Sequence, residues 1–366
     1  MQHMEHYIGI MSGTSLDGID AVLVATNGRE ITLKASTSAP IEPALRERLL
    51  ALASGDAVTA REWGELDVAL GQAYAEVTLQ LLDETGMTAG DVCAIGCHGQ
   101  TVWHQPDAAL PFSLQLGDGN RLAALTGITT ITDFRRKDMA LGGQGAPLVP
   151  AFHQQVLSHP QRLRVVANIG GIANISVLMP GRPVLGYDVG PGNMLMDAWC
   201  RRHTGAPFDK DAALGRRGKV LPALLNSLLS EPWLALPAPK STGRELFNEA
   251  WLNTHLTGEE AVADVQATLA ELTATALVQQ LSALPAGELL VCGGGGHNPL
   301  LMARLTALLP RWRVATTTEA GVNMDAMEAM AFAWLAYQTL HRLPGNLPAA
   351  TGASRPAVLG AIHFPD

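Results

Sequence analysis

The feature that most constrains the fold is a pattern that occurs once in each half of the chain. The first copy is an apolar run, a turn rich in Ser, Thr, Asp and Gly, and a second apolar run, at residues 7–11, 12–18 and 19–25. The second copy has the same order between residues 165 and 178, with two adjacent glycines at its turn. Each copy predicts two strands joined by a tight turn, and the repetition predicts a chain made of two similar halves.

Helices and strands alternate after each copy of this pattern. In the first half we expect a third strand, a helical region and three further strands, at residues 31–36, 43–86, 92–97, 113–116 and 128–132, with a short helix opening near Asp118. In the second half we expect a third strand ending at residues 186–188, helices at 193–203, 264–284 and 324–341, and strands at 288–292 and 313–316. This order predicts an α/β protein, and the paired glycine turns indicate a two-lobed, duplicated actin-like (hexokinase/Hsp70/actin) fold with a nucleotide cleft between the lobes.

Charge and hydropathy exclude several classes of protein. The chain has 25 Lys and Arg against 34 Asp and Glu, a formal net charge of −9, and no run of basic residues, so nucleic acid is not an expected partner. No uninterrupted apolar stretch reaches the length of about 18 residues that a membrane span needs, so we expect a cytoplasmic protein without a membrane partner. The four cysteines lack CxxC spacing and are expected to be buried free thiols.

Three glycine-containing segments are candidates for binding phosphate or nucleotide. Glycines in residues 13–20 would let backbone amides approach a polyphosphate, and the hydroxyls there add donors without adding like charge. Asp17 and Asp20 would repel phosphate unless a magnesium ion with its waters stands between them. The other two segments are the turn at residues 170–171 and the four glycines at 293–296, which follow an apolar run and precede a helix. Ordinary hairpin and βα turns would explain the same residues.

Carboxylates and basic residues at predicted strand ends and helix starts are candidates for catalysis or substrate binding. Asp188 ends an apolar strand before a glycine-rich turn, which suits a general base, although a helix cap is the alternative. Glu328 lies in the first turns of the last long helix, where an ordinary N-terminal charge is the alternative. The basic cluster that begins at Arg135 could bind a substrate carboxylate or simply be solvated.

Together these segments resemble the anhydro-N-acetylmuramic acid kinase family of bacterial cell-wall recycling. The matching motifs span nearly the whole chain in order: GIMSGTSLDGID, GCHGQTVWH, LQLGDGNRLA, TDFRRKDMALGGQGAPLVPAFH, NIGGIANIS, DVGPGNMLMDAW, PAPKSTGRELFN, VCGGGGHNP, MEAMAFAWLA and LPGNLPAATGA. The resemblance implies an actin-like ATPase fold and the use of ATP with Mg²⁺. It also implies conversion of 1,6-anhydro-N-acetylmuramic acid and water to N-acetylmuramic acid 6-phosphate and ADP in peptidoglycan recycling.

The resemblance assigns roles to individual residues. It implies that Asp188 is the catalytic base, that Thr101, Arg135 and Glu328 bind the sugar, and that Asp17 holds Mg²⁺ through water. The implied ATP-binding residues are Gly13, Thr14, Ser15, Leu16, Asp17, Gly18, Ile19, Asp20, Gly170, Gly171, Gly293, Gly294, Gly295 and Asn298. Met324 stands where the resemblance leads us to expect glycine, and PAPKSTGRELFN has no assigned physical role.

These assignments lead to an expected division of the chain into two lobes. We expect an N-terminal lobe at residues 1–130, carrying the first phosphate loop, and the C-terminal tail at about residues 342–366 is a candidate to pack on it. Residues 131–341 would form the second lobe, with the second phosphate loop, the catalytic base and the adenosine site.

Two other functions stay open at this point. One is an actin-like kinase of another sugar or of acetate, and the other is a non-enzymatic protein whose conformation responds to a nucleotide. The expected partners are a small amino sugar and ATP, and the sequence leaves a homodimer open.

Overall fold

The chain folds into two compact units. The computed structural model describes residues 4–13, 16, 18–238 and 240–366. Unit 1 consists of Met1–Val156 and Ala326–Asp366, and unit 2 consists of Leu157–Asp325. Residues 131–156 and 326–341, which we expected in the second lobe, therefore belong to the first unit.

Unit 1 contains a six-stranded sheet with the order β13-β7-β4-β1-β2-β3. β1 is antiparallel to β2, β2 is antiparallel to β3, and β1, β4 and β7 are parallel neighbours. β13 closes one edge by pairing antiparallel with β7, so the C-terminal tail lies in this sheet. The strands are β1 (Glu5–Met11), β2 (Ile19–Thr26), β3 (Ile31–Ala39), β4 (Ala94–Cys97), β7 (Thr130–Thr132) and β13 (Ala361–His363).

Unit 2 contains a five-stranded sheet with the order β10-β9-β8-β11-β12. β8 and β9, and β9 and β10, are antiparallel, whereas β8, β11 and β12 are parallel neighbours. This is the pairing of β1, β2, β3, β4 and β7 in unit 1, so the repeated sequence pattern corresponds to a repeated topology. The strands are β8 (Arg164–Ile169), β9 (Ile172–Leu178), β10 (Leu185–Pro191), β11 (Glu288–Cys292) and β12 (Arg313–Thr316).

Helices of unit 1 pack against its six-stranded sheet. The apolar face of α2 packs into a core with β1 and β2, and α2 begins at a Thr59–Glu62 capping box and ends at Gly86 in the left-handed conformation. α3 begins at Asp118, whose side chain accepts from Asn120 N and Arg121 N, as the sequence predicted. The helices are α1 (Pro43–Ala53), α2 (Ala60–Thr85), α3 (Gly119–Thr126), α4 (Arg136–Ala140), α5 (Val149–Leu157), α11 (Met327–Leu340) and α12 (Pro348–Thr351).

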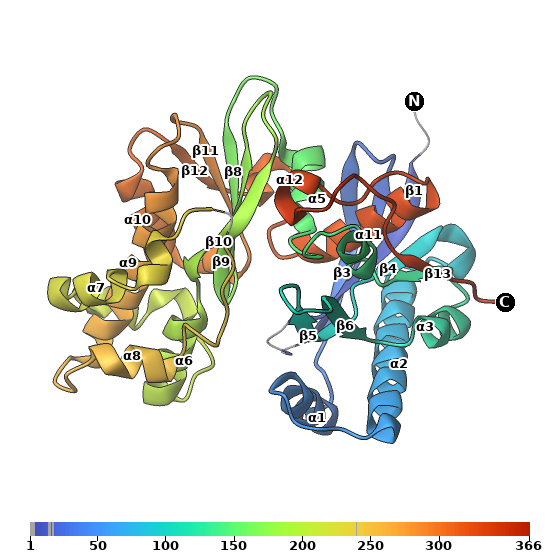
Figure 1. The fold of residues 1–366 in the computed structure, drawn as a ribbon, viewed down its shortest axis with the longest axis horizontal. Coiled ribbons are helices and arrows are strands. Elements are labelled where there is room, and N and C mark those ends of the chain that lie inside the picture. Colours follow the sequence, from blue (N-terminus) through green and yellow to red (C-terminus); the bar gives the residue numbers. More distant parts are fainter. Residues whose placement is uncertain (1–3, 14–15, 17, 239) are drawn as a thin grey trace. The chain divides into compact units, whose positions relative to one another are not determined.

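α11 belongs to unit 1 although it follows unit 2 in the sequence. Gly9 of β1 and Gly96 of β4 lack the Cβ atom that would overlap the backbone of α11 at Ala329 and Phe332. The helix therefore lies directly on β1 and β4, and in Figure 1 the orange-red helix crosses the blue and cyan strands of the N-terminal segment. This close contact explains why the last helix joins the first unit rather than the second.

Unit 2 has two apolar cores connected by one long helix. α9 contributes Ala274, Leu277 and Leu281 to the core beneath β8, β9 and β11, and Leu269 and Leu272 to a second core with α6, α7 and α8. The helices are α6 (Met194–Thr204), α7 (Pro222–Leu229), α8 (Glu249–His255), α9 (Val262–Leu281) and α10 (Pro299–Leu308).

Two local expectations were wrong, and one strand was not predicted. The third strand of the second half does not end at Asp188, because β10 continues to Pro191 through a register shift between Asp188 and Gly190. Residues 100–105 form β5 (Gln100–Gln105), which pairs with β6 (Phe112–Leu116) in a separate two-stranded sheet. Cys93, just before β4, is exposed and not buried as expected, whereas the other three free cysteines, Cys97, Cys200 and Cys292, are buried.

None of the helices within the described ranges combines the length and the apolar character that crossing a membrane requires.

Candidate active site

Asp188 lies in β10 of unit 2, where the strand changes register. Its backbone N donates to Lys240 O at 3.0 Å, so residues 240–242 run along the edge of the strand. Its carboxylate oxygen Oδ2 accepts from Ser241 Oγ and from the Thr242 backbone N, both at 3.0 Å. Burial raises the pKa of Asp188, and the two hydrogen bonds act in the opposite direction. The result is a partly buried carboxylate that is fixed by one oxygen.

Two predicted nucleotide segments of unit 2 meet at Asn193, the residue before α6. Asn193 N donates to Gly170 O at 2.7 Å, and its Nδ2 donates to Ile169 O at 2.9 Å. A Cβ atom on Gly294 would lie 3.2 Å from the same Nδ2. Asn193 therefore connects the turn at residues 170–171 with the glycine run that begins at Gly293.

The glycine run follows β11 and forms a tight turn before α10. Gly293 has φ +75°, and its N donates to Met324 O at 3.2 Å, while Gly295 is buried against Ile169. Asn298 caps α10 by accepting from Leu300 N and Leu301 N, both at 3.1 Å. The Met324 sulfur lies 3.0 Å from where a Cβ of Gly296 would stand, so the unexpected methionine packs against this turn.

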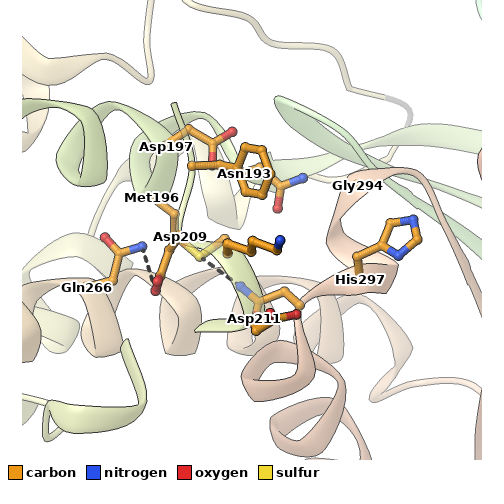
Figure 2. A pocket seen from close by; sticks show the side chains of 11 residues that line it. Asn193, Met196, Asp197, Asp209, Asp211, Gln266, Gly294 and His297 are labelled. Carbon is orange, nitrogen blue, oxygen red and sulfur yellow. Dashed lines mark hydrogen bonds between the residues drawn. The ribbon is translucent and has the colours of Figure 1, made fainter. Parts of the chain in front are cut away.

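A pocket of about 400 Å³ opens beside these turns within unit 2. Figure 2 shows Asn193, Met196 and Asp197 on one wall and Gly294 and His297 on the opposite wall, with the amide of Gln266 bonded to Asp209 Oδ2 at 3.4 Å. The volume is within the range of small-molecule sites. The lining residues are Asn193, Met196, Asp197, Phe208, Asp209, Lys210, Asp211, Gln266, Gly294, His297 and Asn298.

Only Gly294 and Asn298 of this lining were predicted from the sequence. Asn193, Met196 and Asp197 are spaced by three and four positions at the start of a helix, and this spacing places them on one face. This spacing is visible in the sequence and is the signal that indicates these three residues. The segment from Phe208 to Asp211 carried no comparable pattern, because it forms loop and short 3₁₀ structure.

The first predicted phosphate loop lies in unit 1, and part of it can be placed. Thr14, Ser15 and Asp17 lie outside the described residues. Leu16 is buried, its N donates to Gly13 O at 3.1 Å, and its carbonyl accepts from Arg46 Nε at 2.8 Å. Gly18 precedes β2, which buries Ile19 and exposes Asp20 at its start. Leu16 thus anchors the loop in the core while Asp20 faces solvent.

The charged side chains Arg135 and Glu328 lie in unit 1, and Arg135 is hydrogen-bonded to His98. Arg135 donates through Nε and Nη2 to His98 Nε2, at 3.2 and 2.8 Å, and through Nη1 to Gly145 O at 2.8 Å. Because Nε2 accepts both bonds, His98 is a neutral imidazole, and burial together with Arg135 holds its pKa well below the usual value. Burial lowers the pKa of Arg135 to about 10, although the negative charge of Glu328 acts to raise it.

Glu328 is in the first turn of α11, as predicted. Burial raises the pKa of its carboxyl group, Arg135 lowers it, and Asp20 raises it. Three sequence candidates, Asp20, Arg135 and Glu328, are therefore close enough for their charges to interact.

Thr101 lies on the β5–β6 hairpin and is bonded to a different group of residues. Gln115 Nε2 donates to Thr101 Oγ1 at 3.1 Å and to Ser113 Oγ at 2.7 Å. Ser113 Oγ also lies 3.0 Å from His104 Nδ1. The hairpin thus carries connected hydroxyl, amide and imidazole groups, of which Ser113 is buried and Thr101, His104 and Gln115 are partly exposed. Such groups can hydrogen-bond a sugar.

Comparison with known proteins gives one family match and several structural likenesses. A family model described as anhydro-N-acetylmuramic acid kinase matches residues 5–365. Component A of (R)-2-hydroxyglutaryl-CoA dehydratase from Acidaminococcus fermentans is 12% identical, with a TM-score of 0.50 over 92% of this chain and 100% of that chain. A glucokinase of the ROK family from Streptomyces griseus, in complex with glucose and AMPPNP, is 14% identical, with a TM-score of 0.41 over 92% of this chain and 99% of that chain. The first likeness concerns the fold alone, and with the duplicated topology it confirms the actin-like α/β fold.

Proposed function

The chain belongs to the anhydro-N-acetylmuramic acid kinase family, and from that membership we propose the reaction that it catalyses and the residues that carry it out. Membership makes the chain a phosphotransferase that acts on a sugar and uses ATP. The proposed reaction opens the 1,6-anhydro ring of 1,6-anhydro-N-acetylmuramic acid with water and phosphorylates O6. Its products are N-acetylmuramic acid 6-phosphate and ADP, and its proposed setting is peptidoglycan recycling.

The substrate determines what the base must do. The internal 1,6-ether leaves no free 6-hydroxyl, so there is no hydroxyl proton on O6 for a base to remove. Asp188 instead takes a proton from water, whose oxygen bonds to C1 while the C1–O6 bond breaks through an oxocarbenium-like transition state. O6 keeps the electron pair of that bond and attacks the γ-phosphorus of ATP, which releases ADP.

The partly buried Asp188 carboxylate, held by two donors, is the observation that carries this proposal. Burial raises the pKa of Asp188 towards the range in which a general base works best, while the donors from Ser241 and Thr242 keep the carboxylate oriented. Asp188 therefore has both a fixed orientation and a raised pKa. A residue that only caps a helix needs neither.

Sugar binding is proposed for Arg135, Glu328 and Thr101. Burial of the Arg135 guanidinium beside neutral His98 supports a fixed cation that can bind an anionic or hydroxyl group of the sugar. Glu328 can accept hydrogen bonds from sugar hydroxyls, and the hydroxyl of Thr101 is held by Gln115.

Nucleotide binding is proposed for the pocket of unit 2 and for the glycine turns. The pocket beside Gly293, Gly294, Gly295 and Asn298 has a size that suits adenosine. Backbone amides of Gly170, Gly171 and residues 13–20 would bind the phosphates, as glycine turns commonly do.

Magnesium is the metal that this kinase would use. Its preferred ligands are oxygens, and it is usually held by one or two carboxylates together with phosphate and water. The exposed Asp20 carboxylate fits that requirement, and Asp17, which lies outside the described residues, is the second proposed ligand. The bound ion would neutralise the charge that develops on the phosphates.

Measuring ADP release with three acceptors tests the proposal. We expect turnover with 1,6-anhydro-N-acetylmuramic acid and little with free N-acetylmuramic acid or with acetate. Asp188→Asn should lower turnover by about 10²- to 10⁴-fold and largely preserve ATP binding, because the amide keeps the shape but cannot accept the proton. Glu259→Gln, at an exposed loop carboxylate of the same unit, is the matched control and should stay active. Equal turnover of the free sugar, or a nearly normal Asp188→Asn variant, would contradict the proposal.

A further inference from the structure

The motif PAPKSTGRELFN, to which the sequence assigned no role, runs beside Asp188. Lys240 O accepts the hydrogen bond from Asp188 N, and the next two residues donate to the Asp188 carboxylate. Both donors, Ser241 Oγ and Thr242 N, bond the same atom, Oδ2, at 3.0 Å. No hydrogen bond joins Oδ1 to any of the described residues, so the two carboxylate oxygens have different surroundings.

The donor segment is itself held in place by the second core of unit 2. Lys240 Nζ donates to Leu234 O at 2.8 Å and lies 4.4 Å from the centre of the Trp233 ring. Trp233 Nε1 in turn donates to Ser241 O at 3.1 Å. Phe247, at the far end of the motif, is buried and packs edge-on against Trp233. These contacts fix the backbone on both sides of the two donors.

We propose that Ser241 and Thr242 are positioning residues for the general base: they hold Asp188 by Oδ2 so that Oδ1 is the oxygen that takes the proton from water. The inference rests on the proposed function. A carboxylate held by one oxygen keeps the other directed at a fixed position, which a base needs in order to act on a single water molecule. The motif thus contributes to catalysis without contacting the substrate.

Removing the hydrogen bond from Ser241 should change the pKa of Asp188 and therefore the acidic limb of the pH profile of kcat/KM. Burial raises the pKa of Asp188, the bonds from Thr242 and Ser241 lower it, and the charge of Glu245 raises it. Lys240 is directed at backbone carbonyls of residues 233 and 234, so among the described residues Glu245 is the charged group that acts on the carboxylate. Loss of the Ser241 bond therefore raises the pKa of Asp188, and loss of the Glu245 charge lowers it.

The test compares the pH dependence of kcat/KM in three variants of the full-length protein. Ser241→Ala should lower the plateau about tenfold, the worth of a hydrogen bond to a charged group, and should move the acidic limb to higher pH. Ser241→Thr keeps a hydroxyl and should restore both values. Glu245→Gln should move the limb in the opposite direction. Ser230→Ala is the matched control, because Ser230 Oγ donates to the Ser227 carbonyl in the same unit and does not contact Asp188.

The outcomes separate this inference from the proposed function. If Asp188→Asn is inactive but Ser241→Ala has the plateau and the acidic limb of the unmodified protein, the positioning role is wrong and the base assignment stands. A Ser241→Ala plateau that falls without any movement of the limb also overturns the positioning role, because it indicates a general structural effect. If Asp188→Asn is active, the proposed function itself fails.

Discussion

At the scale of single residues, two partly buried carboxylates, Asp188 and Glu328, have different hydrogen-bonding and charged partners. Burial raises the pKa of both Asp188 and Glu328. Asp188 is bonded by neutral donors that leave one oxygen available, which suits proton transfer. Glu328 has the cationic Arg135 as its neighbour, and the charge of Arg135 opposes the larger effect of burial on the pKa of this carboxyl group.

Arg135 should be sensitive even to a conservative change. Arg135→Lys keeps the charge but loses the planar group that bonds His98 and Gly145 together. We expect kcat/KM for the anhydro sugar to fall about 10- to 100-fold, with the KM for ATP little changed. Steady-state kinetics with each substrate varied in turn measures this.

The neighbouring arginine is a suitable control for that measurement. Arg136 is exposed and forms a surface ion pair with Asp133, so Arg136→Lys should leave both kinetic constants nearly unchanged. Equal losses in the two variants would remove Arg135 from the sugar site.

Sequence reasoning identified single residues better than it identified their partners. Asp188 was predicted as a candidate base from an apolar run followed by a glycine-rich turn, and Glu328 became a sugar-binding candidate through the family resemblance. Ser241 is 53 positions from Asp188, in a proline-interrupted stretch without periodicity, so nothing local indicated that the two bond. The same reason hid the contact of Arg135 with His98, which depends on how β4 and the segment after β7 are brought together.

At the scale of elements, the buried carboxylate of Asp138 joins the loop that contains Gly145 to the segment that contains Asn346 and Thr351. Asp138 in α4 accepts from Gly145 N at 2.8 Å, from Asn346 Nδ2 at 2.6 Å and from Thr351 Oγ1 at 2.7 Å. Gly145 O then accepts from Arg135. The segment before β13 is thus connected through one side chain to the loop that holds Arg135 in place.

Loss of this carboxylate should loosen both loops. Asp138→Ala leaves three buried donors without their acceptor, and we expect the local free energy of opening to fall by about 3 kcal/mol or more. Hydrogen exchange of the Gln144 amide, which bonds Thr351 O at 2.8 Å, reports this directly. Thr351→Val should have a smaller effect of about 1 kcal/mol. Unchanged protection of the Gln144 amide in Asp138→Ala would contradict this role.

The sequence predicted helices and strands well where the local conformational propensity agrees with the tertiary packing. It predicted them less well where tertiary packing alone determines the structure. The start of α3 at Asp118 and the bounds of β11 and β12 match the prediction. The β5–β6 hairpin was missed in part because residues 100–105 alternate weakly and contain polar side chains on both faces. α11 was assigned to the second lobe because its contact with β1 and β4 depends on Gly9 and Gly96, whose role becomes visible only in three dimensions.

At the scale of the whole molecule, the duplicated topology divides the proposed roles between the two units. Unit 2 contains Asp188, the glycine turns at residues 170–171 and 293–296, and the pocket beside Asn193. Unit 1 contains Arg135, Glu328, Thr101 and the segment at residues 13–20. Each unit has its own sheet and its own apolar core, so substitutions in one set of residues should change function without unfolding the other unit.

The central claim is that water attacks C1 with Asp188 as the base, and the position of an oxygen label tests it most directly. The reaction is run in ¹⁸O-water and stopped before the reducing sugar exchanges its anomeric oxygen with solvent, and the product is analysed by mass spectrometry. The account predicts one ¹⁸O on C1 of N-acetylmuramic acid 6-phosphate and none in the new phosphate group. Label in the phosphate group, or an unlabelled C1, would show that water attacks elsewhere and would contradict the proposed mechanism.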